Sequence, residues 1–300
     1  MPIVGQPPEG QEQERTLTVK EQQTFFVAKS NELIQKSRFS MSVQQNRIML
    51  YLISKIRPND FGNETYIISI REFCKVCNID FDSGKNHADA KRALKAIADK
   101  SVWVRQDNGD EILLRWLNRV RLNRETNCFE VSFHEDMLPY LYDLQSRYTR
   151  YSLDNVLTMK SKYGIRLYEL LKSYQFLKEQ ISFTVEELKK RLDAEKYSRY
   201  PDFRRYVLEK AVEDINECSD IEVSYTPVKS LNKRGIDYIT FTVRQPLFRE
   251  AYQRKAEKAR KLTKVSGGEL NRRMKRDRAR VRAKEKAEQI QMEITQELEE

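Results

Sequence analysis

The sequence predicts an α+β fold with two similar domains in tandem. Three observations support this prediction. The chain has 300 residues, which exceeds the roughly 150 residues of one typical domain. Short sequence patterns recur in the same order in both halves, and each half alternates helical with strand-like periodicity. The expected divisions are a disordered arm at 1–26, a first domain at 27–147, a second domain at 148–246 and a charged tail at 247–300.

The arm is polar and rich in residues that interrupt regular structure. It combines several prolines and glycines with glutamine and glutamate, so it offers little apolar surface to offset the entropy lost on ordering. It has neither the basic start nor the apolar centre of a signal peptide, and the sequence has no apolar run near the roughly 18 to 20 residues of a membrane span. We therefore expect a cytoplasmic protein.

Helical and strand-like segments alternate after the arm. Helical spacing begins near Val27, and a longer helix follows Ser42 until Pro58 stops it. A β-branched strand from Tyr66 to Ile70 leads directly into a compact helix from Arg71 to Cys77.

A helix and a hairpin complete the first domain. Apolar residues share one face of a helix from Asn86 to Lys100. Two strand-like runs follow, from Ser101 to Gln106 and from Glu111 to Trp116. The Asn108-Gly109 pair between them favours a type I′ turn, so we interpret this segment as a wing. A third strand at Cys128 to Phe133 and a helix at about Glu135 to Gln145 are expected next.

The same order recurs in the second half of the chain. Three residues of the first long helix match three others at a spacing of 117 residues: Ile48, Leu50 and Tyr51 with Ile165, Leu167 and Tyr168. The strand-to-helix segment Ser69 to Phe73 matches Phe183 to Leu188 at a spacing near 114, and Leu94 matches Leu208 at a spacing of 114. Strands at Ile221 to Val228 and Ile236 to Val243 echo the first hairpin. Such an ordered series of matches indicates a duplicated unit.

Each unit has the outline of a winged helix, a helix-turn-helix variant whose second helix can enter the major groove of DNA. In the second unit this helix runs from about Tyr200 to Cys218. Its candidate DNA-binding residues are Arg199, Tyr200, Arg204 and Arg205, because an arginine fork can meet guanine O6 and N7. The alternative is a solvated helix face, since surface arginines are common.

Other candidate DNA-binding residues lie on the first unit and on the second wing. Lys85, His87, Arg92 and Lys95 belong to the first unit, and Lys233 and Arg234 to the tip of the second wing. The alternative for the first-unit residues is a solvated helix face. The alternative for the wing tip is a flexible charged turn, which would contain the same residue types.

Most of the basic excess lies in the tail. The whole chain has a net charge of +10, whereas Arg254 to Lys286 alone carries 15 basic and 4 acidic residues. Only about +4 remains for residues 1 to 253. The tail is expected to add non-specific affinity for DNA, or else to serve only as a solubilising extension.

The sequence offers little material for catalysis, metal binding or cofactor binding. Cys74 and Cys77 form one CxxC without a second pair, and we expect them to pack as small apolar residues. His87 and His134 are the two histidines of the chain, and they do not form the two-histidine metal motif of rolling-circle nicking enzymes. The phosphate-loop pattern is also missing, because Gly84-Lys85 is followed by Asn86 and has no glycine five residues earlier. We predict a protein that is not an enzyme and requires no metal and no cofactor.

Several segments together resemble the theta-type, iteron-binding plasmid replication initiators. The likeness covers roughly Lys29 to Arg244 and lies in four segments: Lys29 to Ile34, Phe133 to Leu141, Ser161 to Leu171 and Phe203 to Asn216. The resemblance implies two winged helices, a monomer that binds directly repeated sites at an origin, and recruitment of the host initiator and replicative helicase. It also implies a homodimer, formed largely through the first domain, that represses its own promoter. The long basic tail departs from the family pattern.

The predicted function is therefore origin binding and melting without covalent chemistry. Affinity would come from phosphate contacts and specificity from a few side chains in successive major grooves. The alternative is a transcriptional regulator that uses the same fold only to repress. The two predictions differ in the binding sites expected beside the gene. An initiator needs directly repeated sites of about 20 base pairs, or two helical turns.

Overall fold

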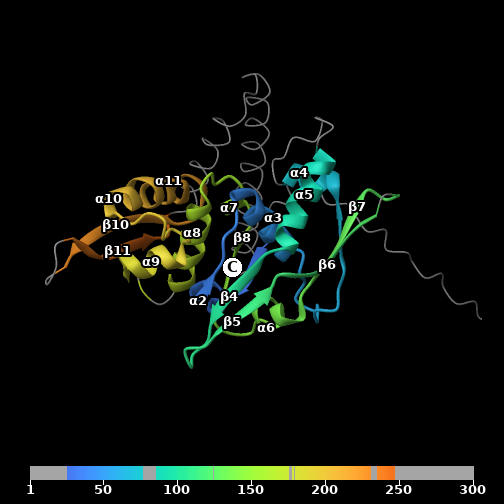
Figure 1. Ribbon diagram of the computed structural model, residues 1–300, viewed down its shortest axis with the longest axis horizontal. Helices are drawn as coiled ribbons and strands as arrows, with labels where there is room; N and C mark the ends of the chain where they lie inside the picture. Colours follow the sequence, from blue (N-terminus) through green and yellow to red (C-terminus); the bar gives the residue numbers. More distant parts are fainter. Residues whose placement is uncertain are drawn as a thin grey trace, which may run out of the picture. The chain divides into compact units, whose positions relative to one another are not determined.

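Figure 1 shows a computed structural model of the protein as a ribbon. The structure describes residues 26–76, 86–123, 125–175, 178, 180–230 and 235–246. The expected charged tail, the tip of the second wing and nearly all of the expected arm therefore lie outside the described residues.

The first domain has the expected winged-helix order of helix, strand, two helices and hairpin. Its elements are α3 (Val43–Ile53), β3 (Tyr66–Ser69), α4 (Ile70–Val76), α5 (Asn86–Ala98), β6 (Leu117–Asn123) and β7 (Cys128–Phe133). The three strands form one antiparallel sheet with β7 in the middle. A capping box at Ser42 begins α3, where the Ser42 hydroxyl accepts the N–H of Gln45 and the Gln45 amide oxygen accepts the N–H of Ser42.

The hairpin that we predicted to be the first wing belongs to a different sheet. Strand β4 (Ser101–Arg105) pairs with β5 (Glu111–Arg115) on one side and with the short strand β2 (Ser37–Arg38) on the other, in the order β2-β4-β5. The strand that precedes the two consecutive helices, β3, pairs instead with β7. The wing of the first domain is therefore β6–β7, and β4–β5 is an additional hairpin inserted before it.

The turn of this inserted hairpin also differs from the prediction. A type I′ turn needs positive φ at both central residues, but Gly109 has φ +96° and Asn108 is not among the residues with positive φ. The loop is longer: Gln106 accepts the N–H of Gly109 at 3.1 Å and donates its own N–H to Asp110 at 2.7 Å. Glycine supplies the single left-handed position.

Two expectations for the next segment were incomplete or wrong. Strand β6 was not predicted, because a register shift between Leu117 and Arg119 interrupts the alternation of apolar and polar residues. The helix expected from Glu135 to Gln145 is reduced to a 3-10 turn, η1 (Glu135–Met137), and one turn of α-helix, α6 (Leu138–Leu141).

The chain begins its described part with a strand rather than the helix expected from Val27. Strand β1 (Phe26–Ser30) pairs antiparallel with β8 (Tyr148–Ser152), and the short helix α2 (Asn31–Lys36) follows β1. Val27 and Lys29 are buried and their neighbours are more exposed, an alternation that is typical of a strand. The expected division at residue 148 thus falls at the start of a strand that pairs with the beginning of the first domain. A short helix, α7 (Asp154–Leu157), follows β8.

The second domain repeats the winged-helix order. Its elements are α8 (Lys162–Tyr174), β9 (Gln180–Thr184), α9 (Val185–Arg191), α10 (Tyr200–Phe203), a π-helical turn η2 (Arg204–Leu208), α11 (Glu209–Cys218), β10 (Glu222–Lys229) and β11 (Ile236–Arg244). The sheet order β9-β11-β10 corresponds to β3-β7-β6 of the first domain. The residues that match in the sequence repeat are buried in both domains: Ile48, Leu50, Tyr51 and Leu94 with Ile165, Leu167, Tyr168 and Leu208.

Gly164 allows α8 and α11 to approach closely. A Cβ atom at this position would lie 3.0 Å from Cβ and 3.2 Å from Oδ2 of Asp214. Asp214 is buried on α11, and its Oδ2 accepts the backbone N–H groups of Lys160 at 2.9 Å and Ser161 at 2.5 Å. The contact therefore fixes the start of α8 against the helix that continues from η2.

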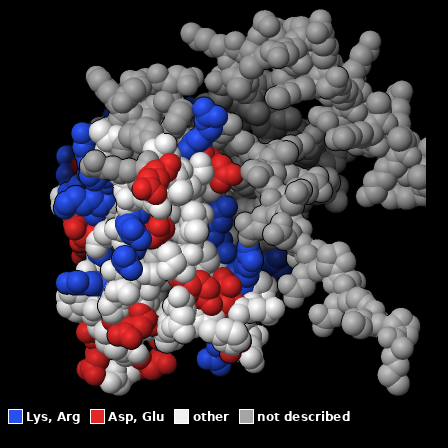
Figure 2. Space-filling view, turned by 90° about the vertical axis from the view of Figure 1, so that its right-hand side faces the viewer, with Lys and Arg blue, Asp and Glu red and all other residues white. Residues whose placement is uncertain are grey.

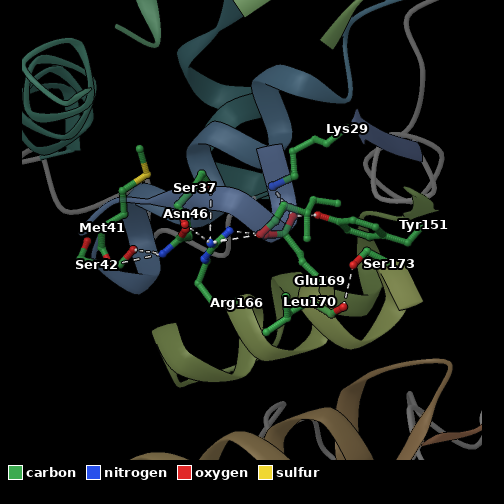
Figure 3. A network of polar contacts seen from close by, with 11 residues as sticks. Lys29, Ser37, Met41, Ser42, Asn46, Tyr151, Arg166, Glu169, Leu170 and Ser173 are labelled. Carbon is green, nitrogen blue, oxygen red and sulfur yellow. Dashed lines mark hydrogen bonds and ion pairs between the residues drawn. The ribbon is translucent and has the colours of Figure 1, made fainter. Parts of the chain in front are cut away.

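A buried polar network joins α8 to strands β1, β2 and β8 (Figure 3). Glu169 on α8 pairs with the Lys29 ammonium, accepts the Tyr151 hydroxyl proton, and lies 3.7 Å from Nη1 of Arg166. Arg166 Nη2 donates to the carbonyl oxygen of Ser37 at 3.2 Å. Burial lowers the pKa of Lys29 and raises that of Tyr151. Two buried cations thus face one buried carboxylate inside the molecule.

Candidate nucleic-acid interface

The second helix of the second helix-turn-helix begins at the predicted position. It runs through α10, η2 and α11, and Phe203, Val207 and Leu208 are fully buried on its inner side. Pro201 lies in the first turn, where a missing N–H costs nothing. Arg204, Arg205 and Tyr206 are exposed on the other side, as are Glu209 and Lys210.

A π-helical turn interrupts this helix at its basic residues. The N–H of Glu209 donates to the carbonyl oxygen of Arg204, five residues earlier. Such turns are rare and often occur at functional sites. Arg204, Arg205 and Tyr206 lie within this turn and are three consecutive exposed residues.

The two adjacent arginines have different surroundings. Arg204 donates from Nε to Glu209 at 2.9 Å, and hydrogen bonds to Tyr225 on β10 and to Glu209 raise its pKa. The guanidinium of Arg205 lies 5.5 Å from the ring centre of Tyr206, and no carboxylate among the described residues pairs with it within 4.0 Å. The Arg205 guanidinium is the better candidate for a hydrogen bond to a base, because Arg204 would first have to break its hydrogen bond to Glu209.

The first two candidates at this end differ in exposure. Arg199 is exposed immediately before the helix. Tyr200 is half-buried and packs on the core, and its hydroxyl is covered without a hydrogen-bond partner among the described residues. Burial raises the Tyr200 pKa. Its surroundings favour a packing role over a DNA contact.

The candidates of the first domain are only partly described. Arg92 and Lys95 are exposed on α5, and Lys95 pairs with Asp99 at 2.6 Å. The backbone of His87 lies in α5, but its side chain is outside the described part. Lys85, Lys233 and Arg234 also lie outside the described residues.

The sequence reasoning missed two arginines of the first wing. Arg119 and Arg121 are exposed on β6, and Arg121 lies 3.4 Å from Glu130 on β7. The alternation of Arg119, Val120, Arg121 and Leu122 after the bulge is the pattern that could have identified them. A wing in this position can contact phosphate or the minor groove.

Basic and acidic residues are mixed over the described part of one face (Figure 2). This face is the right-hand side of Figure 1, where α4, α5, β6 and β7 lie. The mixture agrees with the small net charge of residues 1 to 253. Affinity for a polyanion in this part of the molecule must therefore depend on individually placed cations.

The described residues offer no other obvious chemistry. Cys74 is buried and burial raises its pKa, while Cys77 lies outside the described residues. No group of three or more His, Cys, Asp and Glu residues is placed to hold a metal ion in the described ranges. Within the same ranges, no helix has both the length and the apolar character required to cross a bilayer.

Two successive winged helices with an exposed basic recognition helix define a protein of the helix-turn-helix DNA-binding class. Two family models match the chain: "Initiator Replication protein, WH1" at residues 26–172 and "Initiator Rep protein, WH2" at residues 184–243. Together they cover more than half of the sequence. The chain belongs to this family of replication initiator proteins.

Individual relatives are distant. A replication initiation protein of Escherichia coli is 26% identical over 212 residues, which is 66% of this chain and 64% of that protein. An uncharacterised 27.6 kDa protein of Escherichia coli is 22% identical over 67% of this chain and 88% of its own length. The crystal structure of the Pi initiator protein in complex with iteron DNA has a TM-score of 0.60 at 21% identity, with 74% of this chain and 97% of that chain covered. This likeness supports the two-domain fold.

Proposed function

We propose that this protein initiates plasmid replication by binding directly repeated duplex sites at the origin. The observation that carries the proposal is the exposed arginine end of the second recognition helix in a chain of the initiator family. The Pi initiator, which has a similar fold, was crystallised with iteron DNA. Binding and opening of DNA need positioned contacts rather than covalent chemistry.

The two domains have different roles in this proposal. Residues 148–246 read most of the sequence through Arg205 and the residues beside it. Residues 27–147 add contacts through α5 and through the β6–β7 wing, where Arg119 and Arg121 are exposed. A monomer then covers two successive major grooves of one repeat.

The first domain also offers a surface for a second copy of the chain. Trp103 and Leu113 are directly opposite each other on β4 and β5 and are 43% and 51% exposed. Among the described residues β5 is the outer strand of its sheet, and an outer strand presents an edge that can pair with another strand. We assign the dimer that represses the protein's own gene to this surface. Trp103→Lys should shift the dimer to monomer in analytical ultracentrifugation, whereas Phe61→Lys, at an 81% exposed loop residue, should not.

Recruitment of the host initiator and replicative helicase completes the proposed function. Family membership supports it, because DNA binding by itself neither unwinds nor copies an origin, so other proteins must supply these activities. Pull-down of the purified host proteins by the full chain on origin DNA tests this part. Absence of both partners from the complex would contradict it.

The main test is a footprint on the DNA that flanks the gene. The full chain should protect directly repeated sites of about 20 base pairs, or two helical turns. A small replicon that carries these repeats should stop replicating when the gene is deleted. Protection of inverted repeats alone, with replication intact after deletion, would instead establish a transcriptional regulator.

A further inference from the structure

Three tyrosines form a continuous aromatic ridge beside the recognition helix. We call Tyr163, Tyr197 and Tyr206 the tyrosine ridge. Tyr197 stacks on Tyr206 with ring centres 5.9 Å apart and an angle of 21° between the planes. Tyr163 meets Tyr197 edge to face at 6.4 Å. The rings come from α8, from the segment between α9 and α10, and from η2.

Exposure increases along the ridge from the core to the surface. Tyr163 is 7% exposed, Tyr197 is half-buried, and Tyr206 is 41% exposed. Burial, together with the neighbouring Tyr197, raises the pKa of Tyr163. The Tyr206 ring thus packs on the Tyr197 ring, which in turn packs on Tyr163 of α8.

Exposed cations surround the outer two rings. The Lys210 ammonium lies 5.8 Å and the Arg205 guanidinium 5.5 Å from the centre of the Tyr206 ring. Lys196 lies 5.1 Å from the centre of the Tyr197 ring. Tyrosine hydroxyls and lysine ammonium groups are common phosphate contacts at DNA interfaces. An exposed aromatic surface with three cations close to its outer rings therefore suits contact with duplex DNA.

Helix geometry places Tyr206 on the exposed side of the recognition helix. Phe203 and Val207 are fully buried, so Tyr206 points away from the core. It is adjacent to Arg205 and one turn after Asp202, near the amino-terminal end of the helix, where recognition helices contact bases. Arg205 and Tyr206 are consecutive exposed residues, so a recognition helix lying in the major groove brings both side chains near base edges.

We propose that Tyr206 reads the methyl group of a thymine in the major groove through the edge of its ring. Tyr197 is a positioning residue, and Lys196 and Lys210 bind the flanking phosphates. The contact is apolar because bases in a duplex expose only their edges, and the C5-methyl group is the apolar feature of the thymine edge. The inference rests on the proposed DNA-binding function and assigns part of its specificity.

The experiment uses the full chain and a duplex that it selects from a random pool. Each thymine of the duplex is replaced in turn by deoxyuridine, which removes only the methyl group. Wild-type protein should lose about fourfold in affinity at one position, as expected for one buried methyl group. Tyr206→Ser should bind the unmodified duplex as weakly as the wild type binds that substituted duplex, and should no longer distinguish the two.

Variants of the neighbouring residues separate positioning from simple packing. Tyr197→Phe should keep the discrimination between thymine and deoxyuridine, and Tyr197→Leu should lose it while Arg205-dependent binding remains. Lys196→Ala and Lys210→Ala should each reduce the slope of log affinity against log salt by about 1. Melting temperatures of Tyr206→Ser, Lys196→Ala and Lys210→Ala should stay near the wild-type value, because these three side chains are exposed.

The outcomes distinguish this inference from the proposed function. If the wild type selects no sequence, the proposed function fails. If it selects a sequence but tolerates deoxyuridine everywhere, or if Tyr206→Ser keeps the discrimination, thymine reading by Tyr206 is overturned while DNA binding stands. Unchanged discrimination in Tyr197→Leu overturns the positioning role.

Discussion

The Lys29 ammonium and the Glu169 carboxylate form an ion pair with side chains only 3% and 1% exposed. Lys29 lies on β1 and Glu169 on α8, so the pair links the first described strand to the first helix of the second winged helix. Glu169 also faces Arg166 at 3.7 Å and accepts the hydroxyl proton of Tyr151. One carboxylate therefore serves two buried cations.

This arrangement predicts unequal effects of removing its members. Glu169→Gln leaves both Lys29 and Arg166 without the carboxylate, and should lower the free energy of unfolding by about 3 to 5 kcal/mol or more. Lys29→Met should cost less, because Glu169 keeps Arg166 and Tyr151. Urea unfolding measures both. The matched control is Lys190→Ala, which breaks the exposed pair with Glu186 and should cost less than about 1 kcal/mol. Equal effects of all three changes would contradict the network.

Gly164→Ala tests the close contact of α8 with α11. Alanine in a helix would by itself stabilise the protein by up to about 1 kcal/mol relative to glycine. The added Cβ, however, meets Asp214 at 3.0 Å, and overpacking of this kind typically costs about 1 to 3 kcal/mol. We expect a net loss of stability in urea unfolding. A gain in stability would show that α8 and α11 can separate without cost.

The internal repeat made the core of both domains predictable. Ile48 and Ile165 match in sequence and are both fully buried, because helical periodicity is a local property that a single sequence displays. The second recognition helix was found in the same way. The first wing was not, since the sequence did not reveal β6 as a strand, and only the pairing of β7 with β3 identifies β6–β7 as the wing.

The candidate site was predictable to a similar extent. Arg205 was placed correctly on the exposed side of the helix, whereas the partners of Arg204 were not foreseen, because Tyr225 is distant in sequence. Stacking of Tyr197 on Tyr206 depends on the path of the chain between α9 and α10. Such contacts are non-local, so no periodicity reveals them.

Arg205→Ala should weaken binding to the specific duplex by about 1 to 3 kcal/mol and barely change binding to random DNA, as expected for a base-reading contact. Arg205 has no ion pair among the described residues whose loss would confuse the result. Competition binding at fixed salt measures both affinities. Lys190→Ala on α9 serves as a charge-matched control that should change neither. Equal losses on both duplexes would show that Arg205 only holds phosphate.

Truncation after Gln245 should retain site selectivity and lose salt-sensitive, non-specific affinity. Arg254 to Lys286 carries a net charge of +11, whereas residues 1 to 253 carry about +4. Each neutralised phosphate steepens the dependence of log affinity on log salt by roughly 0.9, so three or four tail contacts give a visible slope. The candidate base-reading residues all precede the cut.

The truncated protein should therefore show a salt dependence flatter by about 3 units and an unchanged order of preference among mutated sites. Filter binding between low and moderate salt, on the selected duplex and on random DNA, provides both quantities. A full-length chain in which Arg272, Arg273, Arg278, Arg280 and Arg282 are all replaced by glutamine separates charge from length, and should reproduce much of the flattening. If selectivity collapses while the slope is unchanged, the tail belongs to the recognition surface, and the assignment of sequence reading to residues 148–246 is wrong.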